Sequence, residues 1–237
     1  MNAWPDGVAT VLLLGAVAAC VLGLGWRLAL WLRTPARRRI VLTPAPRTGP
    51  GVLCSLIGES VLFPTLWRAS RWTWLFGWLF HLGLLLVLLQ HLRYVTAGWW
   101  SWVGWLAAYG HLASAALLIG LAGLWARRVV VERMRWITRP ADHAMLALIA
   151  AIALSGAAMK YARPVDVVAV KGFVRGALKL DPQPLPRHGV FALHLGLGAA
   201  LIALFPFGKL VHGPGLWLNP TRAQPDDARE RAARRGG

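Results

Sequence analysis

The sequence predicts an all-α integral membrane protein, a bundle of five transmembrane helices. Hydrophobic residues make up 57% of the 237 residues and charged residues 15%, whereas roughly 25% of the residues in soluble domains are charged. The apolar residues form long continuous runs and do not alternate with polar ones. Since only helices and closed barrels satisfy the backbone in lipid, continuous runs predict helices.

Five runs reach the roughly 20 apolar residues that cross the hydrocarbon core. The first run follows an acidic start and lacks the basic segment of a cleaved signal peptide, so we expect it to be retained. We predict one five-helix domain over residues 1–219 and a charged, disordered cytoplasmic tail over residues 220–237. The predicted spans are residues 8–32, 72–94, 102–125, 141–159 and 189–211.

Two long connections separate these spans. Residues 34–65 are rich in proline and glycine, and their middle, residues 52–63, is mildly amphipathic. Such a segment is expected to lie at the membrane surface. Residues 160–188 contain four prolines and are predicted to form a polar loop.

The distribution of lysine and arginine predicts an outer N-terminus and an inner C-terminus. Positive charge gathers after spans one and three and in the tail, as it does in cytoplasmic segments. The exception is the outer connection 160–188, which has six basic residues against Asp166 and Asp181. We assign the net charge of +17 to topology and to anionic lipid, and not to nucleic acid, because no soluble basic domain is present. The expected location is the bacterial inner membrane.

The two cysteines, Cys20 and Cys54, do not form a CxxC motif. Neither a zinc site nor an iron–sulfur site can be built from them. One lies in a predicted span and the other in a loop, which argues against a disulfide between them.

Four of the seven histidines lie on spans two and five, namely His81, His91, His194 and His212. An ionisable residue inside a membrane is costly and marks a functional candidate. Because the two spans run in opposite directions, His91 and His194 are expected at one depth near the outer side, and His81 and His212 near the inner side. Two histidines that face each other at one depth can bind one haem iron from both sides. The pattern therefore predicts two haem sites.

The spacing of the histidines differs between the two spans. Ten residues separate the pair on span two, about 15 Å along an ideal helix, and eighteen separate the pair on span five, about 27 Å. Pro206 and Gly208 lie within the longer interval, and a proline kinks or unwinds a helix. We therefore expect His212 on a bent or broken helix end.

Other readings of these polar residues stay open. The histidines can serve as buried hydrogen-bonded groups, although four of them in matching order favour ligation. Zinc is disfavoured, because no three histidines are expected to converge with a carboxylate or thiolate. Three arginines near the ends of span two can pair with haem propionates or anchor the membrane edge: Arg68, Arg71 and Arg93.

Two segments carry a resemblance to a known family. One runs from Pro64-Thr-Leu-Trp-Arg-Ala-Ser-Arg through Leu79-Phe-His81 to Gln90-His91, and the other runs from His194 through Phe205-Pro-Phe-Gly-Lys-Leu-Val-His212. With the ten-residue and eighteen-residue histidine spacings, they resemble the gamma, cytochrome b subunit of respiratory nitrate reductase. Related membrane cytochromes of sulfur and heterodisulfide-type complexes share the pattern. The resemblance covers nearly the whole chain.

The resemblance implies two b haems with bis-histidine ligation. His81 and His212 would hold the proximal haem, and His91 and His194 the distal one. The chain would be the electron-transfer subunit of a quinol-dependent oxidoreductase and not a complete enzyme alone. Quinol would be oxidised near the outer face, and electrons would pass inward to a cytoplasmic iron–sulfur subunit with its catalytic subunit.

The remaining histidines are His111, His143 and His188. His111 lies near the outer end of span three, where the family places a basic residue beside the quinol, and histidine can accept a proton near neutral pH. A packed or interface-facing histidine is the alternative. His188 is expected to be solvated, with a role in proton exit as the alternative, and His143 to mark a helix start.

Two other functions stay open. The same cytochrome can anchor a sulfur or heterodisulfide-reductase-like complex, which requires the same ligands. A non-redox transporter or assembly protein is the third possibility, but we find no inverted repeat of broken helices to favour it.

Overall fold

The structure, a computed structural model, describes residues 7–34, 46–96, 101–218, 225, 226 and 233. These residues form helices and no strand, which confirms the all-α prediction. Apart from three positions, the predicted tail 220–237 lies outside the described residues. In chain order the elements are α1 (Val8–Arg33), α2 (Gly49–Val61), α3 (Pro64–Ala69), α4 (Arg71–Val95), α5 (Ser101–Ala108), α6 (Gly110–Val130), α7 (Glu132–Ile137), α8 (Pro140–Tyr161), α9 (Val167–Leu178), α10 (Gly189–Leu204), the 3₁₀ turns η1 (Phe205–Phe207) and η2 (Lys209–Val211), and α11 (His212–Leu218).

Five of these helical segments are long and apolar enough to cross a membrane, as predicted. They are Val8–Arg33, Arg71–Val95, Gly110–Val130, Pro140–Tyr161 and Gly189–Phe207. Spans one, two and four begin and end within two residues of their predicted bounds.

The third and fifth spans differ from regular helices. The predicted span 102–125 is divided at Tyr109 into α5 and α6, and α6 continues to Val130. The division precedes Gly110, and glycine has a weak helix propensity. In the fifth span, α10 ends at Leu204 and the chain passes through two 3₁₀ turns before α11. The expected break around Pro206 is therefore confirmed.

The chain divides into two compact units. The first is built on residues up to 18 and on residues 70–203, and the second on residues 19–69 and on those from 204 onward.

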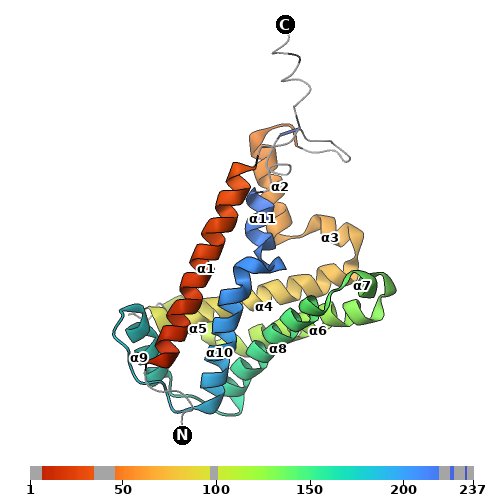
Figure 1. The fold of residues 1–237 in the computed structure, drawn as a ribbon. Coiled ribbons are helices and arrows are strands. Elements are labelled where there is room, and N and C mark those ends of the chain that lie inside the picture. Colours follow the sequence, from red (N-terminus) through yellow and green to blue (C-terminus); the bar gives the residue numbers. More distant parts are fainter. Residues whose placement is uncertain (1–6, 35–45, 97–100, 219–224, 227–232, 234–237) are drawn as a thin grey trace. The chain divides into compact units, whose positions relative to one another are not determined.

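In the first unit, α4 packs against α6, and α6 against α8 (Figure 1). Glycines allow this close approach. A Cβ atom at Gly83 would lie 2.5 Å from the backbone nitrogen of Leu117 and 2.8 Å from the carbonyl oxygen of Ala113. Gly120 on α6 meets the backbone of Phe80 in the same way. Small residues at such crossings are typical of helix packing in membranes.

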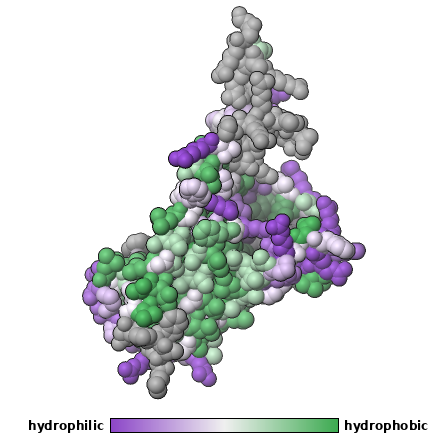
Figure 2. All heavy atoms as spheres, in the orientation of Figure 1, coloured by the Kyte–Doolittle hydropathy of each residue, from purple (hydrophilic) through white to green (hydrophobic). Residues whose placement is uncertain are grey.

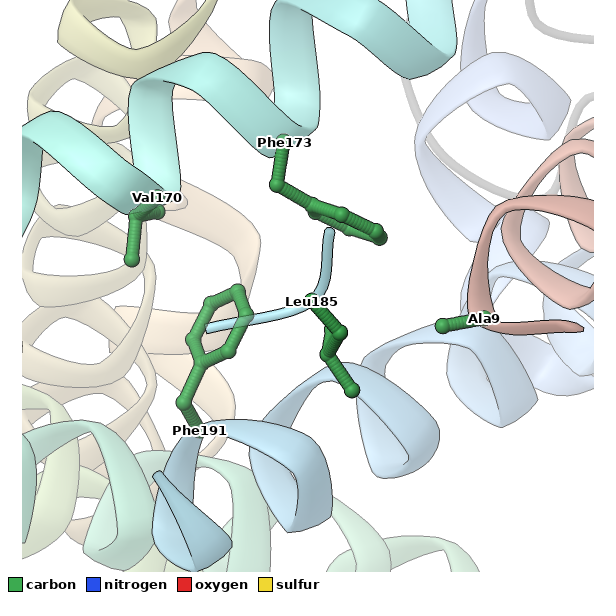
Figure 3. Packing of buried hydrophobic residues seen from close by; sticks show 5 residues of the cluster. All are labelled: Ala9, Val170, Phe173, Leu185 and Phe191. Atoms are coloured by element: carbon green, nitrogen blue, oxygen red, sulfur yellow. The ribbon is translucent and has the colours of Figure 1, made fainter. Parts of the chain in front are cut away.

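The connection 160–188, predicted to be a polar loop, contains the helix α9, so that prediction is wrong for residues 167–178. Asp166 caps this helix, since its Oδ1 accepts hydrogen bonds from the backbone nitrogens of Val168 at 2.8 Å and Ala169 at 3.3 Å. The apolar face of α9 covers the start of α1 and of α10 (Figure 3). The buried cluster consists of Ala9, Val170, Phe173, Leu185 and Phe191.

The second unit joins α2, α11 and the latter part of α1. A Cβ atom at Gly23 would lie 2.6 Å from Cγ of Pro206, so the 3₁₀ turn packs directly on α1. The indole nitrogen of Trp217 on α11 donates a hydrogen bond of 3.1 Å to the hydroxyl of Ser60 on α2. Cys20 and Cys54 both carry free thiols, as expected.

The surface of the described helices is strongly apolar. Leu22, Leu32 and Val130 are each about three-quarters exposed, and such side chains would be costly in water. Apolar side chains cover much of the face drawn in Figure 2, and hydrophilic ones gather toward the ends of the helices. This distribution is what lipid-facing helices require.

Candidate functional site

Helix α4 carries two of the predicted ligands, His81 and His91. The helix begins after Ser70, whose hydroxyl accepts a hydrogen bond of 3.3 Å from the backbone nitrogen of Thr73. The indole nitrogen of Trp72 donates a 3.0 Å hydrogen bond to the carbonyl of Gly123 on α6. Together with the glycine contacts, this bond holds α4 in a defined register beside α6.

The structure brings His91 of α4 and His194 of α10 together within the first unit. Their ring centroids lie 6.2 Å apart, and the ring planes differ by 15°. Two imidazoles whose nitrogens each lie about 2 Å from a metal on the line between them have centroids about 6 Å apart. The spacing therefore suits one metal bound by both rings.

A hydroxyl on α8 orients His194. Oγ of Ser155 donates to the carbonyl of Ile152 at 3.0 Å and lies 2.9 Å from Nδ1 of His194, from which it accepts. Ser155 is only 7% exposed. The next residue is Gly156, where a Cβ atom would lie 3.2 Å from Cε1 of His194. The imidazole of His194 therefore packs closely against the backbone of α8.

Hydrogen bonding gives the four predicted ligands a common tautomer. Nδ1 lies 2.7 Å from the carbonyl oxygen of Gly77 in His81, 2.7 Å from that of Val87 in His91, and 3.1 Å from that of Lys209 in His212. A carbonyl only accepts, so Nδ1 carries a proton in each of these rings. The hydroxyl of Ser155 acts in the same way on His194. Metal-binding histidines commonly donate their other N–H group like this.

Two other histidines have the opposite arrangement. Nδ1 of His143 accepts a hydrogen bond of 3.0 Å from the indole of Trp125, and Nδ1 of His188 accepts one of 3.2 Å from the backbone nitrogen of Phe191. Nδ1 therefore carries the lone pair in both. His143 lies in the first turn of α8 and His188 just before α10, so both lie at helix starts.

The second predicted pair is divided between the two units. His81 is half-buried on α4 in the first unit, and His212 is exposed at the start of α11 in the second. The pairing of these two residues stays a prediction.

Among the three predicted arginines, Arg93 has the most specific surroundings. Its Nη2 donates a hydrogen bond of 2.5 Å to the hydroxyl of Tyr94, and its guanidinium lies 4.7 Å from the centre of that ring. Its Nε is buried and has no hydrogen-bond partner among the described residues. Arg68 on α3 and Arg71 at the start of α4 are exposed. The role of all three toward a haem stays a prediction.

The residues of the first unit fit a b haem. Two adjacent, nearly parallel imidazoles donate through Nδ1 and leave Nε2 for a metal, and the orphaned Nε of Arg93, two residues after His91, could donate to a carboxylate such as a propionate. No group of three or more histidine, cysteine, aspartate or glutamate residues within the described part of the chain could hold a metal ion.

His111 lies exposed in the first turn of α6, and its role at a quinol site stays a prediction. Sequence reasoning missed Ser155, Gly156 and Lys160 on α8. The only signal in the sequence was a serine and a lysine toward the end of an otherwise apolar run.

Comparison with known proteins extends these observations. A sequence model of the nitrate reductase gamma subunit family matches residues 68–222. Two curated relatives are named Hdr-like menaquinol oxidoreductase cytochrome b-like subunit. The protein from Archaeoglobus fulgidus is 34% identical over 179 residues, which cover 69% of this chain and 54% of the relative. The protein from Archaeoglobus profundus is 34% identical over 178 residues, 68% and 53% respectively. The chain thus spans about half the length of the curated relatives it matches.

Proposed function

Because the chain belongs to the nitrate reductase gamma subunit family, we propose that it is the di-haem cytochrome b subunit of a menaquinol oxidoreductase. The observation that carries this proposal is the facing pair His91 and His194, with a ring separation of 6.2 Å. The common tautomer of all four predicted ligands supports it further.

The four histidines take the roles that the family resemblance implies. His91 and His194 would hold a distal haem, and His81 and His212 would hold a proximal haem. Haem b supplies an iron that exchanges one electron at a time. The three arginines would pair with haem propionates. Arg93 would do so at the distal site, and Arg68 and Arg71 at the inner end of α4.

The reaction that we propose begins with menaquinol at the outer side. Its oxidation to menaquinone releases two protons outward and two electrons, and a cytoplasmic iron–sulfur partner accepts the electrons. We assign to His111, which is exposed at the start of α6, the role of accepting one of these protons from a lipid-borne quinol. The membrane is the cytoplasmic one, with the N-terminus outside.

The names of the relatives bear on the partner complex. Both curated relatives are Hdr-like by name. This favours a heterodisulfide-reductase-like complex over a nitrate reductase. The axial ligands are the same for either partner.

The first experiment quantifies haem in the purified full chain from its dithionite-reduced minus oxidised spectrum. We expect two b haems per chain, and one in the His91→Ala variant, because the distal iron would lose a ligand. Retention of both haems in this variant would contradict the assignment. A single haem in the wild-type protein would argue against the pair His81 and His212, and a folded protein without haem would favour the transporter or assembly alternative.

A further inference from the structure

A polar cluster lies where α4, α6 and α8 meet, next to the facing histidines. Gly110 at the start of α6 leaves a space that two polar side chains occupy. A Cβ atom at this position would collide with Nζ of Lys160 on α8 and would lie 2.6 Å from Oε1 of Gln90 on α4. The ammonium of Lys160 and the amide oxygen of Gln90 are thus brought together next to the buried Gly110.

Charge around this cluster is positive. Arg93 follows Gln90 by one turn on α4 and therefore lies on about the same face of that helix. The three helices contain one carboxylate, Asp142, at the opposite end of α8. Positive charges held together at the edge of a membrane favour a ligand with hydrogen-bond-accepting oxygens.

The cluster adjoins the histidine pair but lies in a different direction. Successive residues of a helix are turned by about 100°, so Gln90 faces α6 while His91 faces α10. On α8, Lys160 follows one turn after Gly156, which contacts His194. A group held by Lys160 and Gln90 would therefore lie beside the two imidazoles and not between them.

We propose that Lys160 and Gln90 bind one head-group oxygen of the quinol. A quinol hydroxyl both donates and accepts, so it can donate to Oε1 of Gln90 while it accepts from the ammonium of Lys160. Lys160 is exposed at the end of α8, which gives a lipid-dissolved quinol access to it. This inference rests on the proposed function and adds two residues to it.

The test uses the full-length, haem-loaded protein in detergent. We measure the dissociation constant of a fluorescent inhibitor of the hydroxyquinoline N-oxide class, and the KM for haem reduction by menadiol. Lys160→Gln removes a charge-assisted hydrogen bond, so we expect it to raise the dissociation constant and the KM by about tenfold each. Lys160→Arg should recover part of the loss. Haem per chain and the reduced spectrum should not change.

A second variant removes the space and not the charge. Gly110→Ala should displace the ammonium and weaken inhibitor binding, whereas Gly172→Ala should not, because a Cβ atom there meets no atom within 4 Å. Gln90→Leu should act like Lys160→Gln.

Three outcomes separate the possibilities. Unchanged inhibitor binding and KM in Lys160→Gln and Gln90→Leu would overturn the inference. Haem loss in Lys160→Gln with unchanged inhibitor binding would also overturn it and would assign the lysine to a haem propionate. A wild-type protein that contains haem but neither binds the inhibitor nor reacts with menadiol would instead refute the proposed function.

Discussion

The hydroxyl of Ser155 provides the sharpest test of the distal site. It is the acceptor for Nδ1 of His194 at 2.9 Å. In Ser155→Ala, the N–H group of His194 loses its hydrogen bond to this hydroxyl, while the carbonyl of Ile152 stays close to the ring. Removing the partner of a buried donor costs about 1–3 kcal/mol. A change of 1.4 kcal/mol corresponds to about tenfold in an equilibrium constant. The affinity for the distal haem is therefore expected to fall by between about fivefold and 150-fold.

A second estimate narrows this range. Removing the hydrogen-bond partner of a metal-binding histidine typically weakens metal binding by about 10- to 100-fold. We therefore expect Ser155→Ala to release one of two haems at least tenfold faster than the wild-type protein. Transfer of haem to excess apomyoglobin, followed by absorbance, measures this rate.

The matched control is Ser114→Ala. Ser114 on α6 donates a hydrogen bond of 2.9 Å to the carbonyl of Gly110, four residues earlier, and bonds no histidine within the described part of the chain. It should release haem at the wild-type rate. If Ser155→Ala also did so while remaining folded, His194 would not be an axial ligand oriented by this hydroxyl, and the reasoning would fail.

Two further predictions concern quinol binding and helix packing. His111→Ala should retain both haems but raise the KM for menadiol, because an exposed base near the outer side is lost; an unchanged KM would exclude a role in quinol oxidation. Gly83→Ala should lower the midpoint of thermal unfolding in detergent, since its Cβ would lie 2.5 Å from the backbone of Leu117 and overpacking costs about 1–3 kcal/mol. Gly198→Ala, where nothing lies within 4 Å, should have no effect or raise the midpoint. Equal shifts in the two glycine variants would contradict the packing argument.

The membrane spans were predictable because their signal lies along the chain itself. A run of about 20 apolar residues must cross the hydrocarbon core whatever its neighbours are. The break near Pro206 was predictable for a similar local reason, since proline lacks the N–H group of a helix.

Helix α9 and the division at Tyr109 were not predicted, because the local sequence in each region indicated a different structure. The four prolines of residues 160–188 suggested a loop, although they flank the helical part. The signal for a helix was present in the cap Asp166, followed by apolar residues at helical spacing. At Tyr109, only the following glycine marks the break.

The approach of His91 to His194 was predictable from the sequence, but the residues around the pair were not. The depth argument led to the expectation that His91 faces His194, because helix rise and direction are known in advance. Ser155, Gly156 and Lys160 depend on the rotation of α8 about its axis and on its distance from α10. Neither quantity can be read from one sequence.

The glycine contacts between α4 and α6 have a consequence for electron transfer. His81 and His91 are part of one uninterrupted helix, so the two proposed redox centres are separated by a fixed rise of about 15 Å. The rate of electron tunnelling falls steeply with distance, and a helix free to bend would change it continually. Gly83 lies between the two histidines and presses the backbone of α4 against α6. The close packing at this crossing would thus keep α4 straight. The distance between the two redox centres would then stay constant while the ends of the protein bind their partners.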